Sequence, residues 1–240
     1  MSPFNKIAIA IAIALFAILM IWPLLQQDGI EANSKHSVLT EDYLGDGSSP
    51  IIPIPLSMDL DQGKIELGEQ LFNDPILSSN GFSCASCHPL SSAGMDGLKL
   101  SLTSSGGSDQ MNTPTVFNSG FNALQLWNGK VDTLEQQTHN VIHNPQHMNA
   151  SWPRILDRLQ LNPHYLKQFN ALYADGLNSD NIINAIVTFE RSLITPNADF
   201  DQYLRGNMEA ITNDQKKGYC LHARPYFWIP VYCRACRQFF

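Results

Sequence analysis

Apolar residues recur at helical spacing in several stretches of the chain, and segments rich in Gly, Pro, Ser and Asn separate these stretches. The first such pattern, in residues 59–77, predicts a helix that ends near Pro75. Its expected inward positions are Ile65, Leu67, Leu71 and Phe72. Residues 152–176 and 178–194 predict further helices, and 197–206 predicts a short one opened by a capping Asn or Asp.

Other segments do not keep this period. Residues 26–57 are rich in Ser, Pro and Gly and predict a linker. Residues 89–130 predict irregular structure with short strands at most, and residues 131–147 predict a short helix followed by a loop. We therefore expect a mostly α fold with long irregular loops, preceded by an N-terminal apolar helix.

The apolar run from Ile7 to Leu25 is continuous rather than periodic. As a helix, about 19 residues would measure about 28 Å, close to the thickness of the hydrocarbon core of a bilayer. Lys6 precedes the run, and no strong small-residue cleavage site follows it closely. The pattern predicts an uncleaved signal anchor over residues 1–26, with a cleaved signal peptide as the alternative. Either reading places the remaining chain in the periplasm, in the first case held at the inner membrane.

The charge balance narrows the choice of partners. The sequence has 15 Lys and Arg against 22 Asp and Glu, a formal net charge of −7. This acidic balance gives no support to nucleic-acid binding. It indicates an ordinary solvated acidic surface or, alternatively, a surface that docks a basic redox partner.

One motif carries specific chemistry. Cys84-Ala-Ser-Cys87-His88 has the C-x-x-C-H form of a c-type haem attachment site. The two thiols add across the haem vinyl groups, and the neighbouring imidazole reaches the iron. The alternatives are a redox or disulfide C-x-x-C, or a zinc site shared with Cys233 and Cys236. The distance along the chain between the two Cys pairs argues against zinc.

Residues from about 58 to 219 resemble the bacterial di-haem cytochrome c peroxidase family, which includes the MauG proteins. The resemblance rests on "LGEQLFNDPILSSNGFSCASCHPLSSAGMDG", "NTPTVFNSGFNALQLWNGKVDTLEQQ", "HNPQHM" and "FERSLITPNADFDQYLRG". It implies a cytochrome c-like haem domain over residues 58–205 and an incomplete second haem domain over 206–240. It also implies covalent haem c on Cys84 and Cys87, with His88 as the proximal ligand.

The resemblance extends to other residues, one at a time. Trp127 matches a tryptophan that relays electrons between two haems, and its alternative is a packed core aromatic. Asn112 matches an asparagine that helps bind calcium, and its alternative is a turn residue. Gln137 matches a distal-pocket glutamine, and its alternative is an exposed polar residue of a helix.

Two departures from the family pattern bear on the reaction. His147 stands where the family has a glutamate that assists cleavage of the peroxide O–O bond. A histidine can shuttle protons near neutral pH, can instead ligate the iron, or can simply be an exposed loop residue. Residues 101–110 contain no histidine, although many family members take a distal capping histidine from this loop. Its absence favours an open sixth position on the iron.

The tail from Cys220 onward departs in composition, with three of the five cysteines in its sequence. Arg237 follows the Cys233 and Cys236 pair, and a guanidinium offers no lone pair to iron. We expect no working second haem site. A shifted reading frame after Tyr219 would explain the break, as an alternative to a Cys233–Cys236 disulfide that would leave Cys220 unpaired.

These observations predict a haem c peroxidase that reduces hydrogen peroxide with electrons from a small cytochrome c or cupredoxin, impaired by loss of the second haem. The family resemblance is also compatible with a homodimer. The alternative function is a single-haem electron carrier without enzymatic activity, in which Met148, Met111 or Met95 supplies the second axial ligand.

Overall fold

A computed structural model describes residues 51–223, and the side chains of residues 51–221. The chain divides into residues 1–44 and 45–240, so every described residue belongs to the second unit. Two predicted segments lie outside the described residues. They are the signal anchor with the first part of the linker, and the segment that contains Cys233, Cys236 and Arg237. Within residues 51–223, no helix is long and apolar enough to cross a membrane.

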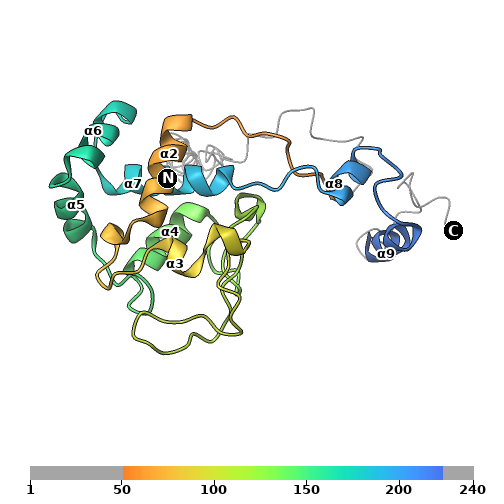
Figure 1. Ribbon diagram of the computed structural model, residues 1–240, viewed down its shortest axis with the longest axis horizontal. Helices are drawn as coiled ribbons and strands as arrows, with labels where there is room; N and C mark the ends of the chain where they lie inside the picture. The colour runs from red at the N-terminus through yellow and green to blue at the C-terminus, as the bar shows by residue number, and fades with distance from the viewer. Residues whose placement is uncertain (1–50, 224–240) are drawn as a thin grey trace, which may run out of the picture. The chain divides into compact units, whose positions relative to one another are not determined.

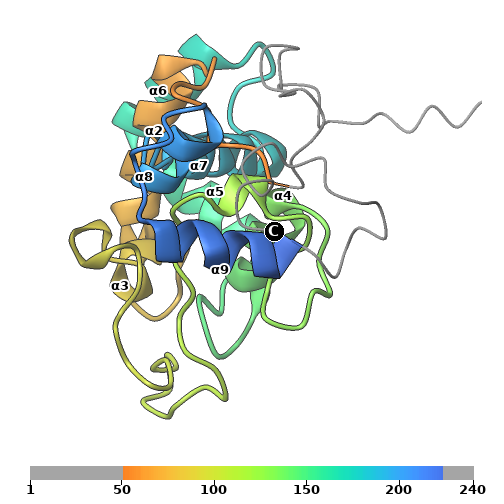
Figure 2. The same cartoon turned by 90° about the vertical axis from the view of Figure 1, so that its right-hand side faces the viewer.

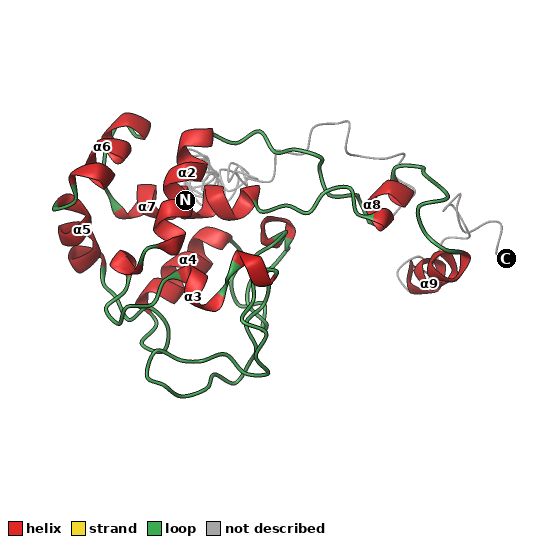
Figure 3. Cartoon of the chain, in the orientation of Figure 1, coloured by secondary structure: helices red, strands yellow, loops and turns green. Residues whose placement is uncertain are grey.

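The described chain is built from helices and loops, and the mostly α prediction is confirmed (Figure 3). Residues 89–130 are irregular as predicted, with pairing limited to the single bridges Leu102–Ser108 and Gln125–Val131. In chain order the α-helices are α2 (Gln62–Asn73), α3 (Cys84–Cys87), α4 (Leu134–His143), α5 (Trp152–Gln160), α6 (Pro163–Leu172), α7 (Ser179–Ser192), α8 (Asp199–Leu204) and α9 (Asn213–Ala223). Short 3-10 turns occupy Pro75–Leu77, Leu90–Ser92 and Ser119–Phe121.

Helices α2 and α7 cross at the centre of the fold (Figure 1). The crossing is close because Gly68 has no side chain: a Cβ there would lie 2.1 Å from the carbonyl oxygen of Ala185. Leu67 and Leu71 of α2 join Ile182 and Ile186 of α7 in the main apolar core. This core also takes in residues from α4, α5 and α6, namely Ile142, Ile155, Leu159, Tyr165 and Phe169.

A second cluster links the helix crossing to the Cys-x-x-Cys-His segment. Phe72 and Phe189 pack edge to face with ring centroids 5.3 Å apart, and Val116 completes the buried group. Cys84 and Leu90 pack against this cluster from the short helix α3 and the turn that follows it. The crossing helices therefore position the segment that carries the haem motif, which lies beside the long loops (Figure 2).

Three sequence-level details differ from the structure. Ile65 is half-buried rather than fully inward, although it contacts the second cluster. Leu161, part of the apolar pattern in residues 152–176, is 84% exposed because it caps α5 just before Asn162 and Pro163 begin α6. The capping residue of α8 is Ala198, not an Asn or Asp.

Asp201, in the first turn of α8, caps the N-terminus of this helix in place of the N-cap side chain. Its carboxylate accepts hydrogen bonds from the backbone N–H groups of Ala198, at 3.2 Å, and Ile54, at 2.9 Å. Helix α9 begins at Asn213 and continues through Cys220. Cys220 is 2% exposed and disulfide-bonded, so the alternative that leaves Cys220 unpaired is wrong.

Candidate haem site

The haem motif forms one helical turn. In helix α3, the Ser83 backbone N–H donates to Ser86 Oγ at 2.9 Å, which fixes the start of the turn. The His88 N–H donates to the Cys84 carbonyl at 2.9 Å and closes it. Cys84 and Cys87 are both free thiols and both half-buried. The turn therefore presents two reduced sulfurs and an imidazole within five consecutive residues.

The His88 imidazole is oriented by the backbone. Its Nδ1 lies 3.0 Å from the carbonyl oxygen of Gly94, which accepts the Nδ1–H proton and leaves Nε2 with the lone pair that a metal needs. Gly94 has φ +69°, and a Cβ there would meet Val116 Cγ2 at 2.8 Å. Glycine at this position thus allows the carbonyl to reach His88.

The electrostatics of His88 keep the ring neutral. Burial lowers its pKa below the ordinary value for histidine, while the backbone carbonyls of Gly94 and Pro114 and the carboxylate of Asp96 act in the opposite direction. The nearby His147 contributes a smaller further lowering. A neutral imidazole is the form that ligates a metal ion.

Burial also keeps the two thiols protonated. It raises the pKa of Cys84 to about 12, and the nearby Glu190 carboxylate adds to the increase. The pKa of Cys87 is raised by burial and then by Asp96. Free thiols beside a backbone-oriented imidazole fit covalent attachment of a haem c, with His88 offering Nε2 to the iron. They fit a disulfide redox pair poorly, because such a pair usually contains a thiol of lowered pKa.

His147 lies on a loop that is tied to the segment preceding the haem motif. The Asn80 side-chain amide donates to the His147 carbonyl at 2.6 Å, and Asn80 Oδ1 accepts from the Phe82 N–H at 3.2 Å. The ring Nε2 of His147 lies 3.8 Å from Asp109 Oδ2, within ion-pair distance. His147 is therefore neither in the apolar core nor a freely exposed loop residue.

Gln137 occupies helix α4, whose buried face of Leu134, Thr138 and Ile142 packs towards the core. Gln137 itself is half-buried. Helix α4 ends at His143, so the loop that carries His147 follows it directly. A shallow cavity of about 320 Å³ borders the same helix, but it is lined by Lys130, Val131, Glu135, Gln136, His139 and Asn140 and contains none of the predicted site residues.

Trp127 and Asn112 are brought together by the long loops. Trp127 is 58% exposed, which excludes the alternative of a packed core aromatic. Its indole N–H donates to the Asn112 backbone carbonyl at 3.0 Å. Within residues 51–223, no group of three or more His, Cys, Asp or Glu is placed to hold a metal ion, and the calcium role of Asn112 stays a prediction.

Two residues near the site were not singled out from the sequence. Asp109, which faces His147, is the single charged residue of loop 101–110. Its isolation in the sequence could have marked it as a candidate site residue. Glu190, whose charge acts on Cys84, falls at the inward helical spacing set by Ile183, Ile186 and Val187. A carboxyl group at a core position of α7 was therefore visible in the periodicity.

Comparison with known proteins places the chain in a family. A family model described as di-haem cytochrome c peroxidase matches residues 62–209. The chain is 43% identical over 176 residues to cytochrome c peroxidase Ccp of Escherichia coli (strain K12), covering 72% of this chain and 38% of that protein. It is 37% identical over 177 residues to cytochrome c551 peroxidase of Nitrosomonas europaea, covering 72% of this chain and 53% of that protein.

A solved structure supports the same assignment. The crystal structure of a MauG-like protein associated with microbial copper homeostasis matches 73% of this chain and 53% of its own, with a TM-score of 0.61 and 30% sequence identity. The chain spans about half the length, or less, of the curated relatives named above. Because the family model covers more than half of the sequence, this chain belongs to the di-haem cytochrome c peroxidase family.

Proposed function

We propose that this chain carries one haem c on Cys84 and Cys87, with His88 as the proximal ligand, and reduces hydrogen peroxide. The reaction consumes two electrons and two protons for each peroxide and yields two waters. The observation that carries the proposal is the His88 geometry: Nδ1 is engaged by the Gly94 carbonyl, and the remaining nitrogen adjoins two free thiols. When bound, the haem supplies the iron at which the peroxide O–O bond is cleaved.

The protein groups around this site have separate tasks. Gly94 holds the His88 ring in one tautomer, because its carbonyl accepts the Nδ1–H. Gln137 orients the peroxide through its amide, and His147 receives the first proton of peroxide and returns it to the departing oxygen. His147 suits this task because an imidazole exchanges protons near neutral pH.

Electron supply and location are part of the proposal. A small cytochrome c or cupredoxin donates electrons in the periplasm, and the exposed Trp127 indole lies on the route into the haem domain. The second haem is absent from the proposed cofactor content because Arg237 cannot ligate iron. Turnover with a protein donor is therefore expected to be slow relative to a single reaction with peroxide.

Two of the three candidate axial methionines give little support to the alternative of an electron carrier. Met148 is 3% exposed and packs in the main apolar core, and Met111 is 48% exposed on the loop surface. Visible spectroscopy separates the two functions. A high-spin ferric spectrum that changes on addition of peroxide is expected, whereas the charge-transfer band of a Met-ligated ferric haem would identify the carrier.

The direct experiment counts haems and tests the ligands. The full chain is expressed in a host competent for cytochrome c maturation, and the purified protein is analysed by mass spectrometry and pyridine haemochrome. One covalent haem is expected for the unmodified chain, and none for the Cys84→Ser, Cys87→Ser double variant. His88→Gly is expected to keep its haem and to regain the native spectrum with added imidazole. A colourless unmodified chain, or two haems, would contradict the proposal.

A further inference from the structure

The loop that carries His147 is clamped on a second side by residues 101–110. The Ser104 N–H donates to the Gln146 carbonyl at 2.9 Å, and Ser104 Oγ donates to the Pro145 carbonyl at 3.0 Å. Together with the Asn80 bond to the His147 carbonyl, these contacts fix the backbone of His147 from both directions. What remains to be fixed is the imidazole ring.

Asp109 is placed to fix that ring. Its backbone N–H donates to the Ser101 carbonyl at 2.7 Å, and its Oδ1 accepts from the Gln110 N–H at 2.6 Å. With Oδ1 engaged in this local turn, Oδ2 is the oxygen that faces His147 Nε2, at 3.8 Å. The side chains are 27% and 30% exposed, so both are partly withdrawn from water.

We propose that Asp109 is a positioning residue that holds the Nε2–H tautomer of His147 and leaves the lone pair on Nδ1 for proton transfer. The role of His147 in that transfer rests on the function proposed above, whereas the tautomer assignment does not. A separation of 3.8 Å is longer than a hydrogen bond, but contacts of catalytic groups in ligand-free structures are often long and tighten when substrate binds.

The chemistry follows from the carboxylate. An ionised Asp only accepts hydrogen bonds, so it favours a proton on the nitrogen that faces it. Nδ1 then takes a proton from peroxide, and the resulting imidazolium is stabilised by the Asp109 charge before Nδ1 returns the proton to the departing oxygen.

Asp109→Asn tests the proposal sharply because the substitution keeps the local turn. Asn Oδ1 can still accept from Gln110, which turns the Asn NH2 group toward His147 Nε2. A donor at that point favours the lone pair on Nε2 and moves the proton to Nδ1. The variant should fold, since a partly exposed ion pair contributes little to stability. Asp132→Asn, at an exposed aspartate, is the matched control for charge.

The first measurement is independent of activity. Holoprotein labelled with ¹⁵N-histidine is reduced and saturated with carbon monoxide, which makes the haem diamagnetic, and long-range ¹H–¹⁵N spectra are recorded above about pH 8, where an ordinary histidine is neutral. We expect Nε2–H for His147 in the unmodified chain and in Asp132→Asn, and Nδ1–H in Asp109→Asn. The same tautomer in Asp109→Asn as in the unmodified chain would overturn the proposal.

The second measurement is the rate of reaction with hydrogen peroxide by stopped flow. General acid–base catalysis contributes about 100- to 10,000-fold to such rates, and a loss of this order is expected for Asp109→Asn. In a His147→Gln background the Asp109→Asn change should cause no further loss, and an equal loss there would overturn the proposal. If the unmodified holoprotein does not react with peroxide, the proposed function fails, and the tautomer spectra still decide the positioning role.

Discussion

Glu190 offers a quantitative test of the packing between α4 and α7. Its side chain is 7% exposed, and among the residues that the structure describes Oε2 has no hydrogen-bond partner. The adjacent Arg191 does not neutralise it directly, because the Arg191 guanidinium pairs with Glu135 at 2.9 Å. Burial raises the pKa of Glu190 from 4.5 to about 7, with Arg191 opposing the increase and Glu135 adding to it. We predict that Glu190→Gln stabilises the protein at alkaline pH.

The size of the effect follows from proton linkage. Below pH 4.5 Glu190 is protonated in both the folded and the unfolded chain. Between pH 4.5 and about 7 the folded state binds more protons than the unfolded state, so the free energy of unfolding falls as pH rises. Above about pH 7 the loss is complete and amounts to about 3 kcal/mol, at about 1.4 kcal/mol for each pH unit. Glutamine is neutral throughout and avoids this loss.

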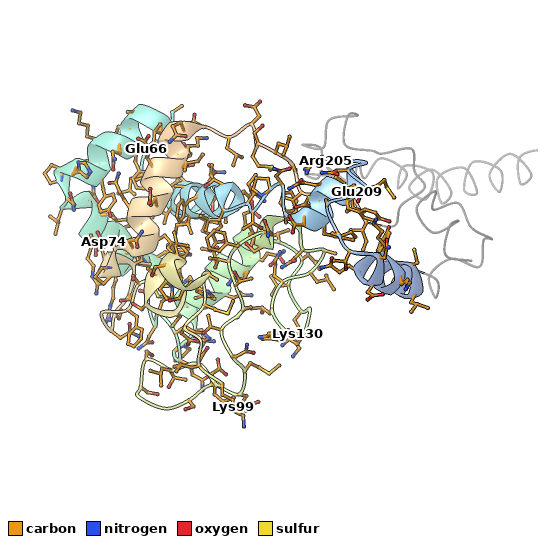
Figure 4. The ribbon with its side chains drawn as sticks, turned by 45° about the vertical axis from the view of Figure 1, so that its right-hand side comes forward. Glu66, Asp74, Lys99, Lys130, Arg205 and Glu209 are labelled. Carbon is orange, nitrogen blue, oxygen red and sulfur yellow. The ribbon has the colours of Figure 1, made fainter. Side chains whose placement is uncertain are left out.

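The assay is urea denaturation of the haem-loaded chain, followed by circular dichroism. Glu190→Gln should match the unmodified chain near pH 4.5 and exceed its unfolding free energy by about 3 kcal/mol at about pH 8.5. Glu66→Gln is the control, because Glu66 lies on the exposed face of α2 (Figure 4). If the difference between Glu190→Gln and the unmodified chain does not change with pH, the carboxyl is not buried as described.

Two further predictions concern the helix crossing and the thiols. Gly68→Ala should destabilise the chain by about 3 kcal/mol in the same denaturation assay, because the new methyl group meets the Ala185 carbonyl. Gly218→Ala in α9 is the control: its methyl group meets open space, and the change should be neutral or stabilising. Equal effects of the two substitutions would refute the close helix crossing. In the haem-free chain, Cys87 should be alkylated by iodoacetamide before Cys84, because burial and the Glu190 charge raise the pKa of Cys84 to about 12. Peptide mass spectrometry gives the order of labelling. Faster labelling of Cys84 would contradict the environment described for this thiol.

The helical elements were predictable because their signals are local. Leu67, Leu71 and Phe72 lie at helical spacing and are buried in the structure. The errors occurred where tertiary contacts overrode the local pattern. Leu161 is apolar but exposed, because the chain turns at Asn162 to start α6. The N-terminal turn of α8 is stabilised by a buried Asp201 that also binds Ile54, a residue distant in the sequence.

The candidate site divides in the same way. Cys84, Cys87 and His88 lie within five consecutive residues, and the chemistry of haem attachment requires that spacing, so the motif by itself predicted the cofactor class. The sequence singled out Trp127 and Asn112 separately. It did not predict the contact between the Trp127 indole and the Asn112 carbonyl, because that contact depends on the path of two loops.

The sequence by itself determined that this chain is mostly helical, that it carries a C-x-x-C-H turn and which family it resembles, because periodicity and short motifs are properties of neighbouring residues. The tertiary structure decided which groups surround that turn. Only the folded chain sets Gly94 against His88, Asp109 against His147 and a buried Glu190 near Cys84. Side chains of this kind change one another's protonation across space, and no local pattern records the distances on which that coupling depends.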